Sequence, residues 1–263
     1  MKQESSCPYT TRLQKGGALL DDMRALVRGW QNGGVSAQRE EGVRANVLAK
    51  QSRSRMTDIY QETFLPRFVR GPIPDAWQIV RPLEDRHMPI EVVRPVYYWI
   101  TAQSEAILYD FAAEWLFAQV SRGDYAVTPA DTVSWIRRKL RAYGKTWSDP
   151  NTLRVAQGVL AALRDFGILE GRAKKRIAPV HLPVEAFAYL AFAIHLWGPS
   201  GERLVHHQDW RLFLLTPQAV EHLLLDAHQR HLLEYHAAGK LVRIEFPADS
   251  LEAMADVLVA RAN

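Results

Sequence analysis

The stretch formed by residues 129–182 constrains the fold most, because two amphipathic helices, a tight turn and a basic hairpin follow one another in it. The spacing of its apolar residues predicts a first helix over residues 130–143. Thr128-Pro129 supplies a cap and a preset first turn, and Gly144 favours the left-handed conformation that ends a helix. The apolar face of this helix is expected to consist of Val133, Ile136, Leu140 and Tyr143.

A second helix is predicted to begin at Ser148-Asp149-Pro150, where a capping residue precedes a proline near the first helical position. It is expected to end at Gly167. The face that carries Arg154 and Gln157 is expected to point to solvent. The residues of its buried stripe are expected to be Leu153, Ala156, Leu160, Leu163 and Phe166.

Two short strands are predicted after the second helix, at residues 168–171 and 177–182, with the charged loop 171–176 between them. Helix, turn, helix and basic hairpin are the outline of a winged helix-turn-helix. In DNA-binding versions the second helix enters the major groove, and cations of the loop contact flanking phosphates. Many winged helices serve as protein-docking modules, so this outline leaves both functions open.

Cations gather in this stretch, although the whole chain carries a formal charge of only +4. Residues 137–145 hold five Lys or Arg residues and residues 171–181 hold four, with no acid in either run. Such patches bind phosphate even when the net charge is small. The predicted DNA contacts are Arg137, Arg138, Arg141, Lys145, Arg154, Gln157, Lys174, Lys175 and Arg176. A second-rank DNA-binding surface consists of Arg12, Lys15, Lys50, Arg53 and Arg55.

The predicted fold class is mainly α, with a helical N-terminal domain and a winged-helix-like unit that has a small β-sheet. Residues 1–15 are expected to form a flexible arm. A boundary at Asp124 divides the chain into a helical N-terminal domain, residues 1–124, and a winged-helix-like C-terminal domain, residues 125–263. Further helices are predicted near residues 18–30, 36–50, 52–71, 97–120, 184–197 and 216–236, and after the cap Asp249-Ser250, with short helices and turns over 71–95.

Two tertiary contacts are also expected from this order of elements. The apolar helix at residues 184–197 should pack under the winged unit. The alternating segment at residues 241–246 is predicted to be a strand that joins the sheet of that unit.

Sequence motifs of catalysis are absent. There is no Gly-x-x-x-x-Gly-Lys-Ser/Thr loop, no Gly-x-Gly-x-x-Gly and no Gly-x-Ser-x-Gly. The single cysteine, Cys7, excludes an intrachain disulfide. The C-terminal histidines match no zinc spacing; they are His206, His207, His222, His228, His231 and His236. We therefore expect a protein that is not an enzyme and has no cofactor, no metal site and no small-molecule substrate.

The N-terminal segment lacks the apolar core of a secretion signal. The most apolar run, residues 187–197, is about half as long as a helix that crosses a bilayer. These features predict a soluble, cytoplasmic protein without a membrane partner.

Three segments carry a resemblance to a known family. Residues 9–20 (YTTRLQKGGALL), 46–55 (NVLAKQSRSR) and 244–258 (IEFPADSLEAMADVL) resemble the BrxA family of BREX phage-defence systems. The resemblance implies a mostly helical, non-enzymatic protein that binds DNA and whose helical part is similar to NusB, a transcription antitermination factor. BREX systems combine such a protein with a methyltransferase, an ATPase and other components. The family offers no catalytic residues to transfer, so the DNA contacts rest on the charge pattern alone.

The leading hypothesis is a non-enzymatic accessory protein of a BREX system that binds double-stranded DNA mainly through phosphate contacts, with other BREX components as possible partners. One alternative is a protein-docking adaptor that assembles other components of the defence complex. In that case the apolar, histidine-rich C-terminal region should matter more than the lysines of the wing. A second alternative is RNA binding through the NusB-like helical part.

Overall fold

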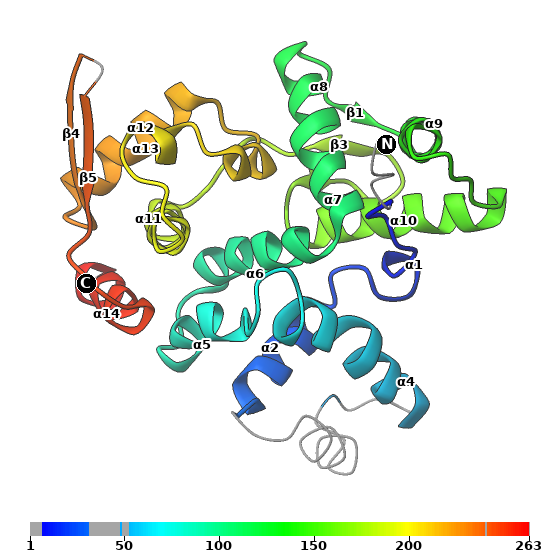
Figure 1. The fold of residues 1–263 in the computed structure, drawn as a ribbon, viewed down its shortest axis with the longest axis horizontal. Coiled ribbons are helices and arrows are strands. Elements are labelled where there is room, and N and C mark those ends of the chain that lie inside the picture. Colours follow the sequence, from blue (N-terminus) through cyan, green and yellow to red (C-terminus); the bar gives the residue numbers. More distant parts are fainter. Residues whose placement is uncertain (1–6, 32–47, 49–52, 240, 263) are drawn as a thin grey trace, which may run out of the picture.

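The computed structural model describes residues 7–31, 48, 53–239 and 241–262, and the chain is mainly helical with two small antiparallel sheets (Figure 1). The elements of the N-terminal half are α1 (Leu13–Gly16), α2 (Leu20–Gly29), α4 (Arg53–Asp58), the π-helix η1 (Ile59–Val69), α5 (Trp77–Asp85), α6 (Ile90–Ser104), α7 (Ala106–Asp110), the π-helix η2 (Phe111–Leu116) and α8 (Phe117–Ser121). The predicted helix at 36–50 lies outside the described residues, apart from Leu48.

Helix α6 runs through the middle of the molecule and connects its parts (Figure 1). It packs against η1 and α5 on one side and against C-terminal elements on the other. Its buried side chains include Tyr97, Tyr98 and Trp99, which are nearly inaccessible to solvent. The helix begins seven residues before the predicted start at Tyr97. The prediction placed Pro95 before the helix, whereas Pro95 lies within it.

The predicted helix over 97–120 is interrupted at Glu105, whose φ and ψ of −116° and 80° are not helical. The carboxylate of Glu105 is buried and pairs with the buried guanidinium of Arg67 at 3.2 Å and with Arg12 at 3.5 Å. Burial lowers the pKa of Arg67, and the neighbouring Glu105 opposes that shift. The break in the helix thus directs the carboxylate of Glu105 into the core, where ion pairs with its two arginine partners compensate its charge.

The prediction of a flexible arm over residues 1–15 is wrong for its described part, residues 7–15. Leu13 is fully buried, and the hydroxyl of Tyr9 donates a 2.6 Å hydrogen bond to Asp110. Burial raises the pKa of both groups. The carbonyl of Leu13 lies against Gly158, where a Cβ atom would come within 2.3 Å of its oxygen. This segment is therefore part of the core.

Residues 125–182, which were predicted to be winged-helix-like and are called the winged-helix-like unit below, follow α8. The elements of this unit are β1 (Ala126–Val127), α9 (Pro129–Ala142), α10 (Asp149–Asp165), β2 (Leu169–Glu170) and β3 (Lys175–Ile177). The three strands form an antiparallel sheet in the order β1-β3-β2, in which Ala126 and Glu170 both lie opposite Arg176. The two predicted helices and the presence of a hairpin after them are confirmed, and β1 is an additional strand that was not predicted. The predicted bounds of the second strand, residues 177–182, are wrong: β3 covers Lys175–Ile177, so Lys175 and Arg176 belong to the strand and not to the loop, and residues 178–182 form no strand.

The C-terminal elements are α11 (Val184–His195), α12 (Glu202–Val205), the 3-10 helix η3 (Gln208–Phe213), α13 (Pro217–Gln229), β4 (Glu234–Ala238), β5 (Leu241–Glu245) and α14 (Leu251–Ala262). The predicted last helix and its cap are confirmed, since the amide of Ala253 donates to the hydroxyl of Ser250. The main contacts of α11 are with α6, α13 and α14, rather than with the winged unit as expected.

Two predictions for residues 216–246 are wrong. The helix that was expected to reach His236 ends at Gln229, because His231 adopts the left-handed conformation and the amide of Leu232 bonds back to the carbonyl of Ala227. Strand β5 does not join the central sheet. It pairs with β4 in a separate hairpin, which projects from the side of the molecule opposite α9 and α10 (Figure 1).

The apolar core is continuous through the described residues and extends across Asp124. Elements from both sides of that residue pack together, for example α1 with α10 and η2 with η3. The division into two domains at Asp124 stays a prediction. None of the helices in the described ranges has the length and hydropathy that crossing a membrane requires.

Candidate nucleic-acid interface

Helix α9 begins with a capping box that fixes its first turn. The hydroxyl of Thr128 accepts from the amide of Asp131 at 3.1 Å, and the carboxylate of Asp131 accepts from the amide of Thr128 at 3.2 Å. Of the predicted apolar face, Ile136 and Leu140 are buried, but Tyr143 is 36% exposed and packs edge-on against Tyr9. Arg137, Arg138 and Arg141 lie on the exposed face, as the helical spacing predicted.

Helix α10 packs on the core through one stripe and exposes a long face. Four of the five predicted stripe residues are buried: Ala156, Leu160, Leu163 and Phe166. Leu153 is the exception, with 43% of its surface exposed. The actual stripe is centred on Thr152, Val155 and Val159, so Leu153 falls at its outer edge. Leu153, Arg154 and Gln157 therefore share the exposed face of this helix.

The wing is the turn between β2 and β3. Gly171 has a φ of +86°, and a Cβ atom there would come within 2.0 Å of the carbonyl oxygen of Lys174, so this turn requires glycine. Arg176 pairs with Glu170 across the two strands at 2.5 Å, and the Lys175 ammonium donates to the carbonyl of Arg172 at 3.0 Å. Lys174 is the last residue of the turn before β3 and is exposed.

Some cations of the unit have carboxylate partners and others have none. Arg137 pairs with Asp149 at 2.8 Å, which connects α9 to the first turn of α10, and Lys139 pairs with Glu114 of η2. Among residues 125–182, all of which the structure describes, six exposed cations make no ion pair: Arg138, Arg141, Lys145, Arg154, Arg172 and Lys174. Arg172 was counted in the basic run of the wing but was not among the predicted contacts. Its position in the wing turn of the sequence could have identified Arg172 as a further DNA contact.

The charge of the winged unit differs in sign from that of the rest of the chain. Residues 125–182 contain eleven Lys and Arg residues and four Asp and Glu residues, a formal balance of +7. Because the whole chain carries +4, the remaining residues together carry −3. The positive potential is therefore concentrated on this unit.

The second-rank surface is not brought together in the same way. Arg12 is turned inward, where its guanidinium pairs with Glu105 and donates to the carbonyl of Ser104. Lys15 is exposed on α1, and Arg55 is partly buried on α4. Lys50 and the side chain of Arg53 lie outside the described residues.

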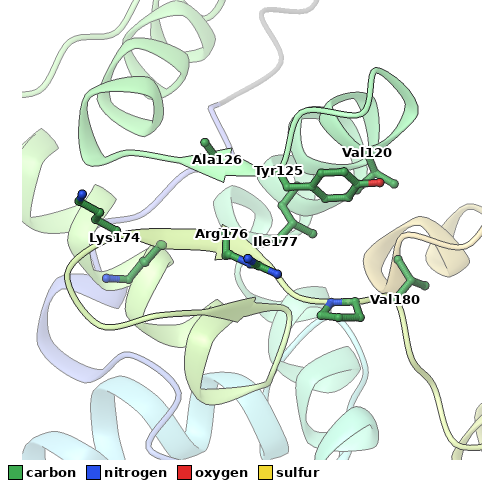
Figure 2. A pocket seen from close by; sticks show the side chains of 9 residues that line it. Val120, Tyr125, Ala126, Lys174, Arg176, Ile177 and Val180 are labelled. Carbon is green, nitrogen blue, oxygen red and sulfur yellow. The ribbon is translucent and has the colours of Figure 1, made fainter.

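A hollow of about 800 Å³ lies beside the wing, between the end of α8, β1, β3 and the segment that leaves β3. Figure 2 shows Val120, Tyr125 and Val180 at one end and Lys174 at the other, with Arg176 between them. Tyr125 and Val180 are 49% and 44% exposed. This concave surface is therefore apolar at one end and cationic at the other.

A family model described as BrxA matches residues 7–193. The chain belongs to the BrxA family. No curated protein and no solved structure matches it. Membership of the BrxA family points to a role connected with BREX, and this family is not known as an enzyme family.

The range matched to BrxA includes the whole winged-helix-like unit and ends within α11. Segment 244–258, one of the three segments for which a resemblance to the family was predicted, lies beyond that range. All six C-terminal histidines named above also lie beyond residue 193. His228 and His231 line a polar hollow of about 690 Å³ together with His195. Among the described residues, no three His, Cys, Asp or Glu side chains are grouped so that they could hold a metal ion.

Proposed function

We propose that this BrxA protein binds double-stranded DNA with its winged-helix-like unit, as a non-enzymatic accessory component of a BREX system. The observation that carries the proposal is the exposed face of α10 together with the unpaired cations of the same unit. These cations lie on α9, in the turn that follows it and in the wing. An exposed helix flanked by cations suits the major groove, because the helix meets base edges while the cations meet phosphates.

Each part of the unit has a separate task in this proposal. The exposed face of α10 enters the major groove with Gln157 and Arg154. Arg138, Arg141 and Lys145, on and after α9, contact one phosphate strand. Arg172 and Lys174 of the wing contact phosphates beside the major groove.

Arg137 and Arg176 are available to the same phosphates although both are paired. Their partners, Asp149 and Glu170, are themselves exposed to solvent. Exposed ion pairs contribute roughly 0–1 kcal/mol, so exchanging a carboxylate for a phosphate costs little.

Binding to a fluorescent duplex across a salt series tests this proposal. Arg138→Ala/Arg141→Ala and Arg172→Ala/Lys174→Ala should each weaken binding and reduce the log–log salt slope by about two, because each phosphate contact contributes about 0.9. The matched control is Arg230→Ala/Arg243→Ala, which removes the same charge from exposed residues of the C-terminal region. That variant should bind like wild type.

The outcomes separate the proposal from its alternatives. If the control variant loses as much affinity as the other two, binding follows the net charge and the winged unit is not the site. If wild type fails to bind duplex DNA even at low salt, the proposal is wrong. A structured RNA that displaces the duplex at a lower concentration than competitor DNA would favour the RNA-binding alternative.

The hollow beside the wing favours a second candidate function, a protein-docking adaptor. Its exposed Tyr125 and Val180 lie near Lys174 and Arg176, so the complementary occupant is a segment of a partner protein with apolar and acidic side chains. Tyr125→Ala should weaken complex formation with a purified component of the same BREX system, and it should leave duplex affinity within twofold because it changes no charge. If no purified component of the system binds either wild type or the variant, this second candidate function is wrong.

A further inference from the structure

One apolar side chain lies on the face of α10 that is proposed to meet DNA. Leu153 is 43% exposed, and it precedes Gln157 by four residues, so the two side chains lie on one ridge of the helix. A single exposed leucine is common on protein surfaces. Its meaning here comes from its position next to a side chain that can recognise a base.

We infer that the ridge formed by Leu153 and Gln157 recognises A·T base pairs in the major groove. The inference rests on the proposed DNA binding and deepens it by naming the class of sequence. A thymine exposes a methyl group in the major groove, against which an apolar side chain packs. Adenine offers an acceptor at N7 and a donor at N6, which the amide of glutamine satisfies together.

The spacing of the two residues fits this assignment. Four residues of helix rise by about 6 Å, and base pairs are stacked about 3.4 Å apart. Leu153 and Gln157 would therefore meet base pairs about two steps apart when α10 lies along the groove.

The same ridge offers little to guanine, which is contacted mainly by arginine or lysine. Arg154 follows Leu153 directly and is therefore offset by about 100° around the helix, so it does not belong to the ridge of Leu153 and Gln157. Asp149, one turn before Leu153, is held by Arg137 at 2.8 Å. The ridge between Asp149 and Gln157 thus favours thymine methyl groups and adenine.

Removing the methyl group from the DNA tests the role of Leu153 directly. Two probes are compared at one salt concentration: an alternating A·T duplex and the same duplex with deoxyuridine in place of thymidine. Wild type should bind the thymidine duplex about fourfold more tightly, the value expected for one buried methyl group. Leu153→Ala should bind the two duplexes equally.

Leu225→Ala is the matched control, because Leu225 lies on α13 and is 44% exposed. It should keep the fourfold preference. In a parallel arm, an A·T duplex with 7-deazaadenine removes the N7 acceptor and should weaken wild type roughly tenfold. Gln157→Ala should be insensitive to that change.

Each result decides the inference. Equal affinity of wild type for the thymidine and deoxyuridine duplexes overturns the inference. If that binding still depends on salt and on the wing cations, the proposed function stays intact. A preference that survives in Leu153→Ala comes from DNA shape and also overturns the inference. If wild type binds no duplex at all, the proposed function fails first and this inference fails with it.

Discussion

At the scale of the residue, a few buried charges determine how the helical core is held together. The pair formed by Arg67 and Glu105 is almost completely inaccessible to solvent, with Arg12 as a third, partly exposed member. A second buried carboxylate, Glu84, accepts from Arg24 and from the hydroxyl of Tyr97. Removing one partner of such a pair leaves an uncompensated charge in the core, which is far more costly than losing a surface ion pair.

Glu105→Gln should therefore lower the free energy of unfolding by about 3 kcal/mol, because the guanidinium of Arg67 stays buried without a counter-charge. Urea denaturation measures this loss. Asp85→Asn, which removes an exposed pair with Arg81, is the control and should cost less than about 1 kcal/mol. Equal losses in both variants would show that the buried pair has no special role. The double variant Arg67→Met/Glu105→Gln should regain part of the loss.

Gly158→Ala tests the contact between the N-terminal segment and α10. The new methyl group would come within 2.3 Å of the carbonyl oxygen of Leu13, so α1 must move away from α10. We expect a loss of about 1–3 kcal/mol, the usual cost of overpacking. Gly29→Ala is the control, because its Cβ atom meets nothing within 4 Å. A loss of stability in the control but not in Gly158→Ala would contradict this explanation.

At the scale of the element, a helix or strand is predicted correctly when the residues that begin and end it lie within it or next to it in the sequence. The box of Thr128 and Asp131, and the left-handed glycines after α9 and α10, lie within each helix or next to it. Both helices and the hairpin are therefore predictable from the sequence. The left-handed residue that ends α13 is His231, which carries no such signal. The expected helix was consequently extended through β4, and β5 was assigned to the wrong sheet.

The candidate site was predictable in part for the same reason. Helical spacing places Arg137, Arg138 and Arg141 on the exposed face without knowledge of the rest of the chain. It does not reveal which cations have carboxylate partners, since Lys139 meets Glu114 through the tertiary fold. The inward position of Arg12 depends on Glu105, which is 93 residues away in the sequence.

The wing supplies a prediction at this scale. Gly171→Ala puts a methyl group within 2.0 Å of the Lys174 carbonyl at a φ of +86°, so the turn must change its shape. Duplex affinity should fall about as much as in Arg172→Ala/Lys174→Ala, because the wing cations are displaced. Thermal unfolding should change by only a few degrees, since the turn is exposed. Unchanged affinity would mean that the geometry of the wing is irrelevant to binding.

At the scale of the whole molecule, the C-terminal elements beyond the family match are integral to the fold. Helix α11 packs against both α13 and α14. The buried carboxylate of Asp209 accepts from Trp99 at 2.7 Å, from Gln103 at 2.7 Å and from Tyr109 at 2.6 Å, which connects η3 to the central helices. The end of the match to BrxA is therefore not a structural boundary.

A chain that ends at residue 197 should consequently fail to fold into a stable monomer. It would expose the apolar faces of α6 and α11 that the C-terminal elements cover. Size-exclusion chromatography and calorimetry should show aggregation or the loss of a cooperative transition. A soluble truncated monomer with a sharp transition would contradict this prediction.

The contact of Leu13 with Gly158 also has a consequence for the order of events during synthesis. The N-terminal segment leaves the ribosome early, but the surface on which it packs is 145 residues further along the chain. At typical elongation rates this separation corresponds to roughly 7–30 s. During that interval Leu13 has no α10 to cover it. This apolar segment must therefore avoid binding to other proteins or to other parts of the nascent chain until the winged-helix-like unit has been translated.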